Sequence, residues 1–399
     1  MIEAILSRVW RQFSSENIWT YYPVVAALLG LAFAYSIALQ LRANRSPILR
    51  IVFCLLATLS MALFCGLRHK SVGTDTERYY EMVGREFNVT FNQVIENFMP
   101  NRLENRDVEE LPHDVVFHIV SDQLRMVGFS EYGVFTVYAL FYVGVAGWLI
   151  YRYSVNPIIA FFGFLALGGY VFDFTGLRQA IAMGWTMLAF PFIQKRQFLF
   201  FTFFVLVGML FHKSAVIFFP AYFLNRFPVK WWSLLLICVA VFFVYRKGAA
   251  ISELVVKYFG SLDERVEHYF GRENEELRRS VATCAIRFVI LFLYIIVRGK
   301  RKFDSEEALL LRMLFIGAVF EMFSLRGWDA MPRLGLYYSA YTMLLLPRLV
   351  EEAKHRVPLP YSFTVAAIAV TLSLYFMKVI SVYGPYHFNW WGWVNVGIG

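Results

Sequence analysis

The sequence predicts an all-α, polytopic integral membrane protein with about twelve transmembrane helices. Hydrophobic residues make up 59% of its 399 residues and charged residues 17%, whereas a soluble globular domain has roughly 25% charged residues. Apolar runs of about 20 residues, enough for a helix to cross a bilayer, recur along the chain. Backbone amides cannot hydrogen-bond to lipid, so these runs must be helical. We expect a single transmembrane domain over residues 1–399, because the spans must bury their polar faces against one another.

The predicted elements begin with a helix that lies in the membrane interface. Residues 1–20 place Ile2, Ile5 and Val9 at helical spacing with polar and charged residues between them, which is typical of an amphipathic interfacial helix. The apolar runs that follow are expected to cross the membrane at roughly residues 21–41, 48–67, 130–151, 157–174, 178–194, 197–211, 213–225, 231–246, 281–299, 308–326, 333–350 and 360–380.

The segment 197–225 is too long for one upright helix and short for two. We therefore predict a bent or re-entrant pair that turns near His212. A single crossing here would reverse the orientation of everything downstream and would place Arg178 and Arg333 on opposite sides of the membrane.

Lysine and arginine in short connecting loops predict the sidedness, because such residues favour the cytoplasmic side. The basic connections alternate correctly if all of them are cytoplasmic: Arg42/Arg45/Arg50, Arg152, Lys195/Arg196, Arg226/Lys230, residues 298–302 and Lys354/Arg356. Two long loops then face outward. Residues 68–129 include an amphipathic stretch, Val115–Val127, that we expect to lie across the mouth of a site as a lid. Residues 247–280 are expected to form an outer loop with a charged surface helix.

Charge and cysteine content exclude several classes of function. The net charge is +9, but the basic residues are spread over short loops, so orientation and anionic headgroups explain them better than nucleic-acid binding. No metal or cofactor motif is predicted, since the pair His113 and His118 near Asp114 is too weak a pattern. The cysteines show no metal-binding spacing and are expected to be small core residues: Cys54, Cys65, Cys238 and Cys284.

Basic side chains recur where the chain reaches the predicted outer side: Arg68, Arg178, His212 and Arg333. An arginine at the bilayer centre costs roughly 2.5–3.5 kcal/mol on insertion scales, so such residues usually line a functional cavity. The guanidinium fork donates paired hydrogen bonds to phosphate oxygens. Several forks around one cavity predict a site for a diphosphate. The alternative is that an arginine at a helix end anchors the protein at the interface.

Other candidate residues flank these positions. Asp75 and Tyr79 follow Arg68, with Gly73 allowing a tight turn, and Asp75 could instead pair with Arg68 or cap the following helix. Gln179 adjoins Arg178 at a helix start, where free amides attract anions. The remaining candidates lie beside His212 or around and after the WDAMP turn: Lys213, Arg326, Asp329 and Tyr337. His212 could also be a structural hinge histidine.

Short motifs in this order resemble the EpsG-like bacterial exopolysaccharide polymerases, a branch of the Wzy-type (O-antigen) repeat-unit polymerases. They are R-x6-D-x3-Y (Arg68, Asp75, Tyr79), LRQxxA (Leu177–Ala182), FHKSA (Phe211–Ala215) and R-x3-YY (Arg333–Tyr338). The resemblance implies a multi-pass enzyme of the bacterial inner membrane that joins polyprenyl-diphosphate-linked oligosaccharides on the outer face. It also implies the GT-C membrane glycosyltransferase architecture by analogy, and a partner that regulates chain length.

The resemblance and the arginine pattern together predict a metal-independent glycosyl transfer. Arg68, Arg178 and Arg333 would stabilise the diphosphate leaving group, with Arg326, Gln179 and Lys213 in support. His212 is the first candidate for the general base, because imidazole titrates near neutrality, and Asp75 is the second. Tyr79 and Tyr337 would stack on sugars. The alternatives are a flippase for lipid-linked oligosaccharides, which should show inverted repeats, and an O-antigen-type ligase.

Overall fold

The computed structural model describes residues 20–41, 47–84, 115–167, 169–226, 277–299, 301–324, 330–354, 356, 359–380 and 386–387. Within these ranges the regular elements are all helices, so the all-helical prediction is confirmed. The predicted interfacial helix, the crossing at 231–246 and most of the two outer loops lie outside the described residues.

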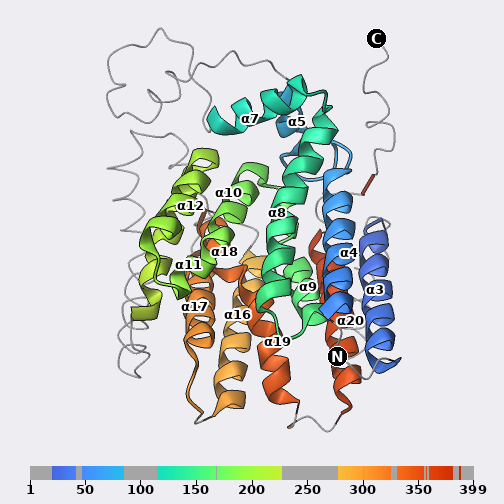
Figure 1. The fold of residues 1–399 in the computed structure, drawn as a ribbon, viewed down its shortest axis with the longest axis vertical. Coiled ribbons are helices and arrows are strands. Elements are labelled where there is room, and N and C mark those ends of the chain that lie inside the picture. Colours follow the sequence, from blue (N-terminus) through green and yellow to red (C-terminus); the bar gives the residue numbers. More distant parts are fainter. Residues whose placement is uncertain are drawn as a thin grey trace.

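The described helices form one bundle (Figure 1). In chain order they are α3 (Tyr22–Leu41), α4 (Pro47–Gly66), α5 (Thr76–Gly84), α7 (Val115–Met126), α8 (Glu131–Tyr153), α9 (Pro157–Ala166), the 3₁₀ segment η1 (Val171–Phe174), α10 (Leu177–Leu188), α11 (Phe190–Gln194), α12 (Phe198–Phe211), the 3₁₀ segment η2 (Lys213–Arg226), α16 (Leu277–Arg298), α17 (Ser305–Ser324), α18 (Ala330–Ser339), α19 (Thr342–Ala353) and α20 (Tyr361–Ile380).

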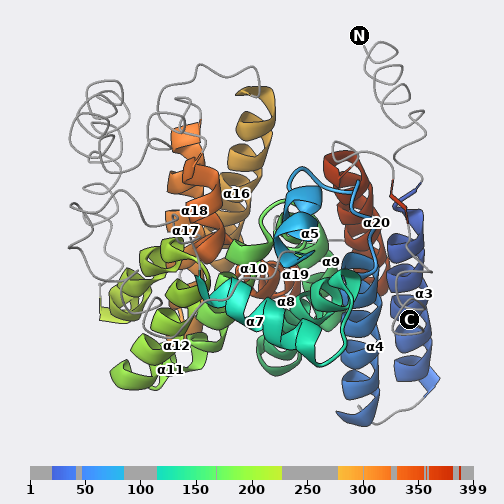
Figure 2. The same cartoon turned by 90° about the horizontal axis from the view of Figure 1, so that it is seen from above.

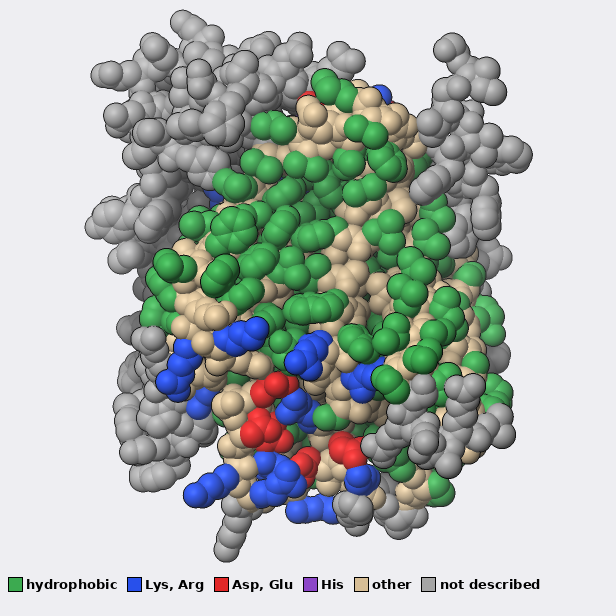
Figure 3. Space-filling model, in the orientation of Figure 1, with side chains coloured by type: hydrophobic (Ala, Val, Ile, Leu, Met, Phe, Trp, Pro, Cys, Tyr) green, Lys and Arg blue, Asp and Glu red, His purple; other side chains and the backbone are tan. Residues whose placement is uncertain are grey.

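Length and composition make several of these segments candidates to cross a membrane. Within the described ranges, five are long and apolar enough: Tyr22–Gln40, Pro47–Gly66, Glu131–Tyr153, Pro157–Phe174 and Tyr361–Ile380. Large apolar side chains on α3, α4, α16 and α20 are exposed, including Phe33, Leu55, Phe292 and Phe363. These side chains give the bundle the apolar outer surface that a membrane protein presents to lipid (Figure 3).

The two ends of the bundle differ in their chemistry. At the end that we call the α5 end, the short helices α5 and α7 lie across the tips of the longer helices (Figures 1 and 2). At the opposite end, which we call the charged end, acidic and basic side chains gather (Figure 3). There Arg298 pairs with Glu307 and Glu352, and Arg348 pairs with Glu306. The predicted cytoplasmic connections 298–302 and 354–356 belong to this charged end.

The segment 197–225 forms a hairpin of two unlike helices. The α-helix α12 and the 3₁₀ segment η2 have 14 residues each. At about 1.5 Å per residue an α-helix of this length rises about 21 Å, whereas at about 2.0 Å per residue a 3₁₀ helix rises about 28 Å. The two arms run antiparallel, since Phe198 near one end contacts Tyr222, and Phe201 contacts Phe218. Stretched 3₁₀ geometry thus lets a short segment run back along the bundle.

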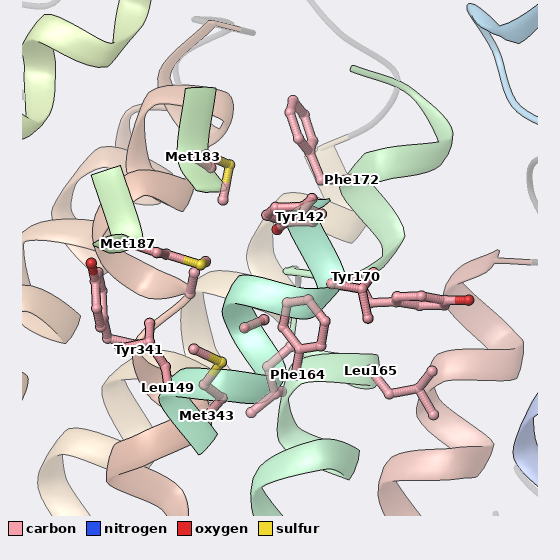
Figure 4. Packing of buried hydrophobic residues seen from close by; sticks show 14 of the residues in the cluster. Tyr142, Leu149, Phe164, Leu165, Tyr170, Phe172, Met183, Met187, Tyr341 and Met343 are labelled. Atoms are coloured by element: carbon pink, nitrogen blue, oxygen red, sulfur yellow. The ribbon is translucent and has the colours of Figure 1, made fainter. Parts of the chain in front are cut away.

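A broken helix crosses the centre of the bundle. Helix α9 ends at Ala166, and an irregular stretch leads through η1 to α10. Its aromatic side chains are buried among α8, α10 and α19 (Figure 4). The Tyr142 hydroxyl donates to the carbonyl of Gly169, and the Tyr170 hydroxyl donates to the carbonyl of Met61. These bonds fix the position, along the bundle axis, of the stretch that leads to Arg178.

Three of the four cysteines fall in the described ranges: Cys54, Cys65 and Cys284 are buried free thiols, as expected for small core residues, and Cys238 lies outside these ranges.

Candidate active site at the α5 end

Arg68 is the first predicted site residue at the α5 end, and the structure buries it. Its side chain is 1% exposed. Nη1 donates to the Cys65 carbonyl at 2.7 Å, and Nη2 donates to the Asp173 carbonyl at 2.9 Å. Nε donates to the Thr76 hydroxyl at 3.3 Å, and Nη1 lies 3.5 Å from Asp173 Oδ2. We expected this guanidinium to line a cavity, whereas most of its donors are bound by other groups of the protein.

The carboxylate that pairs with Arg68 is Asp173, not Asp75. Asp173 is fully buried on η1, where it also accepts from the Cys65 thiol. The rings of Phe135 and Phe174 lie 5.6 Å and 5.0 Å from the Arg68 Cζ atom. Arg68 thus links the end of α4 to the irregular stretch before α10. Sequence reasoning missed Asp173 as a partner, although an acidic residue inside an apolar crossing is the kind of signal that could have identified it.

The turn after Arg68 fits closely against the same stretch. Gly73 has φ +102°, and a Cβ atom there would lie 2.0 Å from the Phe174 carbonyl oxygen. Only glycine adopts this conformation readily and leaves room for that approach. The predicted tight turn is therefore confirmed, and it places Asp75 directly before α5, where its carbonyl accepts from the Tyr79 amide at 3.0 Å.

Tyr79 and Arg178 meet at the α5 end. The Arg178 Cζ atom lies 5.5 Å from the centroid of the Tyr79 ring, and that ring also contacts Phe117 of α7 at 6.0 Å. Tyr79 is only 8% exposed, so in this structure its ring supports Arg178 and is not open to a sugar. Arg178 itself is half-buried.

Arg178 lies in the first turn of α10, whose N-terminus has no side-chain cap. Gly176 occupies the capping position and makes no side-chain hydrogen bond. The first amides of a helix have no intrahelical partner, and they carry partial positive charge. A guanidinium beside such a helix start forms a suitable environment for an anion.

Gln179 joins α10 to α18. Its Nε2 donates to the backbone carbonyl of Arg333 at 2.7 Å. Arg333 is exposed, and no carboxylate pairs with it among the residues that the structure describes. The bond brings the first turns of α10 and α18, which carry Arg178 and Arg333, to the same end of the bundle.

The turn at His212 reaches the same group of helices. His212 ends α12 with an extended backbone, and Lys213 begins η2 with an exposed side chain. The Ser214 hydroxyl lies 2.9 Å from the Tyr337 hydroxyl, and the Tyr338 hydroxyl donates to the Ile217 carbonyl. Tyr337 is 1% exposed, so its ring, like that of Tyr79, faces the protein interior. Since Arg333 and Tyr337 are one helical turn apart, they lie on the same face of α18.

Part of the predicted site lies outside the described residues. Arg326 and Asp329 fall within residues 325–329, which the structure does not describe. The amphipathic stretch expected as a lid is helix α7, which packs against α5, α8 and α12 (Figure 2). Its residue Ser121 hydrogen-bonds with Tyr138 of α8 at 2.8 Å. In the part of the chain that the structure describes, acidic, histidine and cysteine side chains form no group of three or more that could hold a metal.

The chain belongs to a known family of membrane proteins. Residues 51–391 match the EpsG family, so the match spans most of the chain and includes every motif described above. Neither the curated proteins nor the solved structures gave a match to the chain.

Proposed function

We propose that this EpsG-family protein is a membrane glycosyltransferase that polymerises oligosaccharide repeats linked to polyprenyl diphosphate. The observation that carries the proposal is the hydrogen bond from Gln179 to the Arg333 carbonyl. It joins two arginine motifs that are far apart in the sequence, at the end of the bundle that also holds His212 and Lys213. A negatively charged, membrane-anchored substrate suits such a group of cations.

The reaction transfers the growing glycan from its lipid carrier to the next repeat. An acceptor hydroxyl attacks the anomeric carbon, the bond from that carbon to the diphosphate oxygen breaks, and the electron pair leaves with the diphosphate. Arg178, Arg333 and the open start of α10 would stabilise this developing charge. Lys213 would add charge nearby, and Arg326, which lies outside the described residues, keeps its supporting role as a proposal from the sequence. The transfer is proposed to need no metal and no cofactor.

The acceptor hydroxyl must lose a proton to a general base. His212 remains our first choice because it adjoins Lys213 and Ser214, and Ser214 contacts Tyr337 one turn from Arg333. Asp75 is the second choice, since it precedes the helix whose Tyr79 contacts Arg178. The two candidate bases lie in different turns, His212 between α12 and η2 and Asp75 directly before α5, so their variants separate the choices.

Arg68, Tyr79, Gln179 and Tyr337 are assigned to positioning the site. Each is buried, and their contacts link the elements that carry the exposed or half-buried cations. Arg68 holds the stretch before α10 through Asp173. The sugars would instead contact side chains nearer the surface.

The setting of this reaction is also proposed. We place the α5 end outside the cytoplasmic membrane of a bacterium and the charged end in the cytoplasm, because basic residues favour that side. The full chain would make about twelve crossings in a GT-C-like arrangement, as the apolar runs predict. Helix α7 would serve as a lid over the site, and a regulator of chain length is the expected partner protein.

The test uses purified protein in vesicles with a defined polyprenyl-diphosphate-linked repeat and a metal chelator. A ladder of products supports polymerisation. Transfer of one glycan to a different acceptor would indicate a ligase, and movement of the repeat across the bilayer without new linkages would indicate a flippase. Either result would reject the proposal. For arginine variants of the α5 end, Arg301→Ala is the matched control, because Arg301 is an exposed arginine of the charged end.

A further inference from the structure

The broken crossing contains polar backbone where a membrane protein must supply its own hydrogen-bond partners. Asn156 caps the start of α9, accepting from the amides of Ile158 and Ile159. Helix α9 has 10 residues, so it rises about 15 Å, half of a hydrocarbon layer that is about 30 Å thick. The carbonyls that follow α9 therefore lie at mid-depth, where irregular backbone is tolerated only inside the protein.

Side chains from other helices satisfy these carbonyls. Tyr142 of α8 donates to Gly169, as described above, and Arg68 donates to Asp173. The C-terminal end of α9 is met by Arg287 of α16, whose Nη2 donates to the Leu167 carbonyl at 3.2 Å. The last carbonyls of a helix carry partial negative charge, so a cation is favoured there.

Arg287 forms a buried ion pair with Glu321. Arg287 Nε lies 2.5 Å from Glu321 Oε1, and the two side chains are 2% and 5% exposed. Arg287 lies midway along α16, and Glu321 lies on the neighbouring α17. Charged residues within membrane crossings are expensive and usually functional. Buried ion pairs contribute little net stability when compared with well-packed apolar residues of similar size, so fold stability alone gives a weak reason for this pair.

The two ends of the break are treated in opposite ways. At the negative end of α9, Arg287 supplies a cation whose charge Glu321 balances. At the positive end of α10, Gly176 supplies no side-chain cap, and Arg178 follows. The protein places a balanced cation at the first end, whereas no side chain caps the second end.

From this arrangement we propose that Arg287, paired with Glu321, is a positioning residue of the active site. Arg287 holds Leu167, at the start of the irregular stretch between α9 and α10. It thereby fixes the position of Arg178 and of the α10 N-terminus. Arg68 holds the same stretch near its other end, by donating to the Asp173 carbonyl of η1. This role rests on the proposed polymerase function. It names two residues, Arg287 and Glu321, that no motif of the sequence identified.

The test compares variants that remove the pair with and without leaving an uncompensated charge. Arg287→Met removes the cation that pairs with the buried Glu321 and is expected to lower the amount of folded protein. Arg287→Met combined with Glu321→Leu removes both charges and is expected to restore folding. The matched control is Arg298→Met combined with Glu307→Leu, which removes a buried pair at the charged end. For each folded variant, kcat, KM and the melting temperature are measured.

A positioning role predicts that the two double variants differ in kcat. The Arg287/Glu321 double variant should show a kcat per folded molecule about 10- to 100-fold lower, because small displacements of catalytic groups have effects of that order. The Arg298/Glu307 double variant should keep its kcat. Arg287→Lys keeps the charge without the fork and should recover part of the lost rate. A double variant at the mid-depth pair with wild-type kcat would overturn the proposal.

A second measurement does not depend on polymerase activity. Phenylglyoxal modifies arginine, and the modification of Arg178 is followed by peptide mass spectrometry. The double variant should change the Arg178 rate at least about threefold, while the rate at exposed Arg301 stays constant. Unchanged modification of Arg178 would reject the positioning role even if the wild-type protein made no polymer, so failure of the two proposals can be told apart.

Discussion

The two ends of the helix bundle use their basic side chains differently. At the charged end, arginines are matched with carboxylates: Arg298 lies 2.7 Å from Glu307 and 2.9 Å from Glu352, and Arg301 lies 3.1 Å from Glu352. At the α5 end, Lys70 pairs with Glu77 and Arg125 with Glu131, but Lys213 and Arg333 are exposed and have no carboxylate partner among the described residues. Cations that pair with carboxylates link neighbouring helices, whereas exposed cations without a protein carboxylate are available to an anionic ligand.

The buried pairs Arg68–Asp173 and Arg287–Glu321 refine this comparison. Both lie on the α5 side or in the middle of the bundle, yet their charges are balanced within the protein. A basic residue is therefore not a candidate for ligand binding merely because it is an arginine at the α5 end or in the middle of the bundle. The candidates are those basic residues for which the protein supplies no carboxylate.

The largest expected effect is at Arg178. Arg178→Ala should lower the polymerisation rate about 100- to 1000-fold, the usual loss when one preorganised donor to a developing negative charge is removed. Arg178→Lys should restore only part of it, because lysine lacks the guanidinium fork. The rate is measured from the appearance of ladder products. Arg301→Ala at the charged end is the control, and an equal loss in both variants would remove the contrast between the two ends.

The next effect concerns stability at the matched pair Arg68–Asp173. Arg68→Ala leaves a buried carboxylate without its partner, which costs about 3–5 kcal/mol. The amount of inserted protein and its melting temperature should both fall, whereas Arg178→Ala should leave them near the wild-type values. If Arg68→Ala keeps full stability and loses only activity, Arg68 belongs with the substrate-binding cations and the comparison must be redrawn.

The sequence predicted the helical character of the chain, but not which residues of its motifs are buried. The apolar runs predicted the described helices, and the charge pattern predicted the hairpin at His212. The burial of Arg68 against Asp173 was not predicted, because Asp173 is distant in the sequence and their contact depends on tertiary packing. The sequence likewise did not predict that η2 is a 3₁₀ helix, since its apolar composition fits either helix type.

Arg287 and Glu321 were present in the predicted crossings 281–299 and 308–326, yet no motif marked them. A charge inside each of two apolar runs is a usable signal when the charges are opposite. What the sequence does not contain is that α16 and α17 are neighbours, or that Arg287 reaches the end of α9.

A smaller effect is expected at the exposed cations. Arg333→Ala should raise KM for the lipid-linked donor about tenfold, the effect of losing one charge-assisted contact of about 1.5 kcal/mol. Lys213→Ala should act in the same direction. The increase should shrink at high salt, because exposed charges are screened within about 10 Å at 0.1 M ionic strength. A KM that is unaffected in both variants would mean that the exposed cations of the α5 end do not meet the substrate.

The smallest effect is expected at the hydrogen bond between Tyr337 and Ser214. Tyr337→Phe keeps the buried ring and removes only the hydroxyl, so it should cost about 1 kcal/mol. If that bond holds the His212 turn against α18, the loss should be seen in kcat, about fivefold, with KM unchanged. Tyr294→Phe is the matched control, because the Tyr294 hydroxyl donates to Glu307 at the charged end. Equal changes in kcat for the two variants would show that the α5 end has no special sensitivity to the position of this turn. A change confined to Tyr337→Phe would extend the difference between the ends from their charges to the neutral contacts that support them.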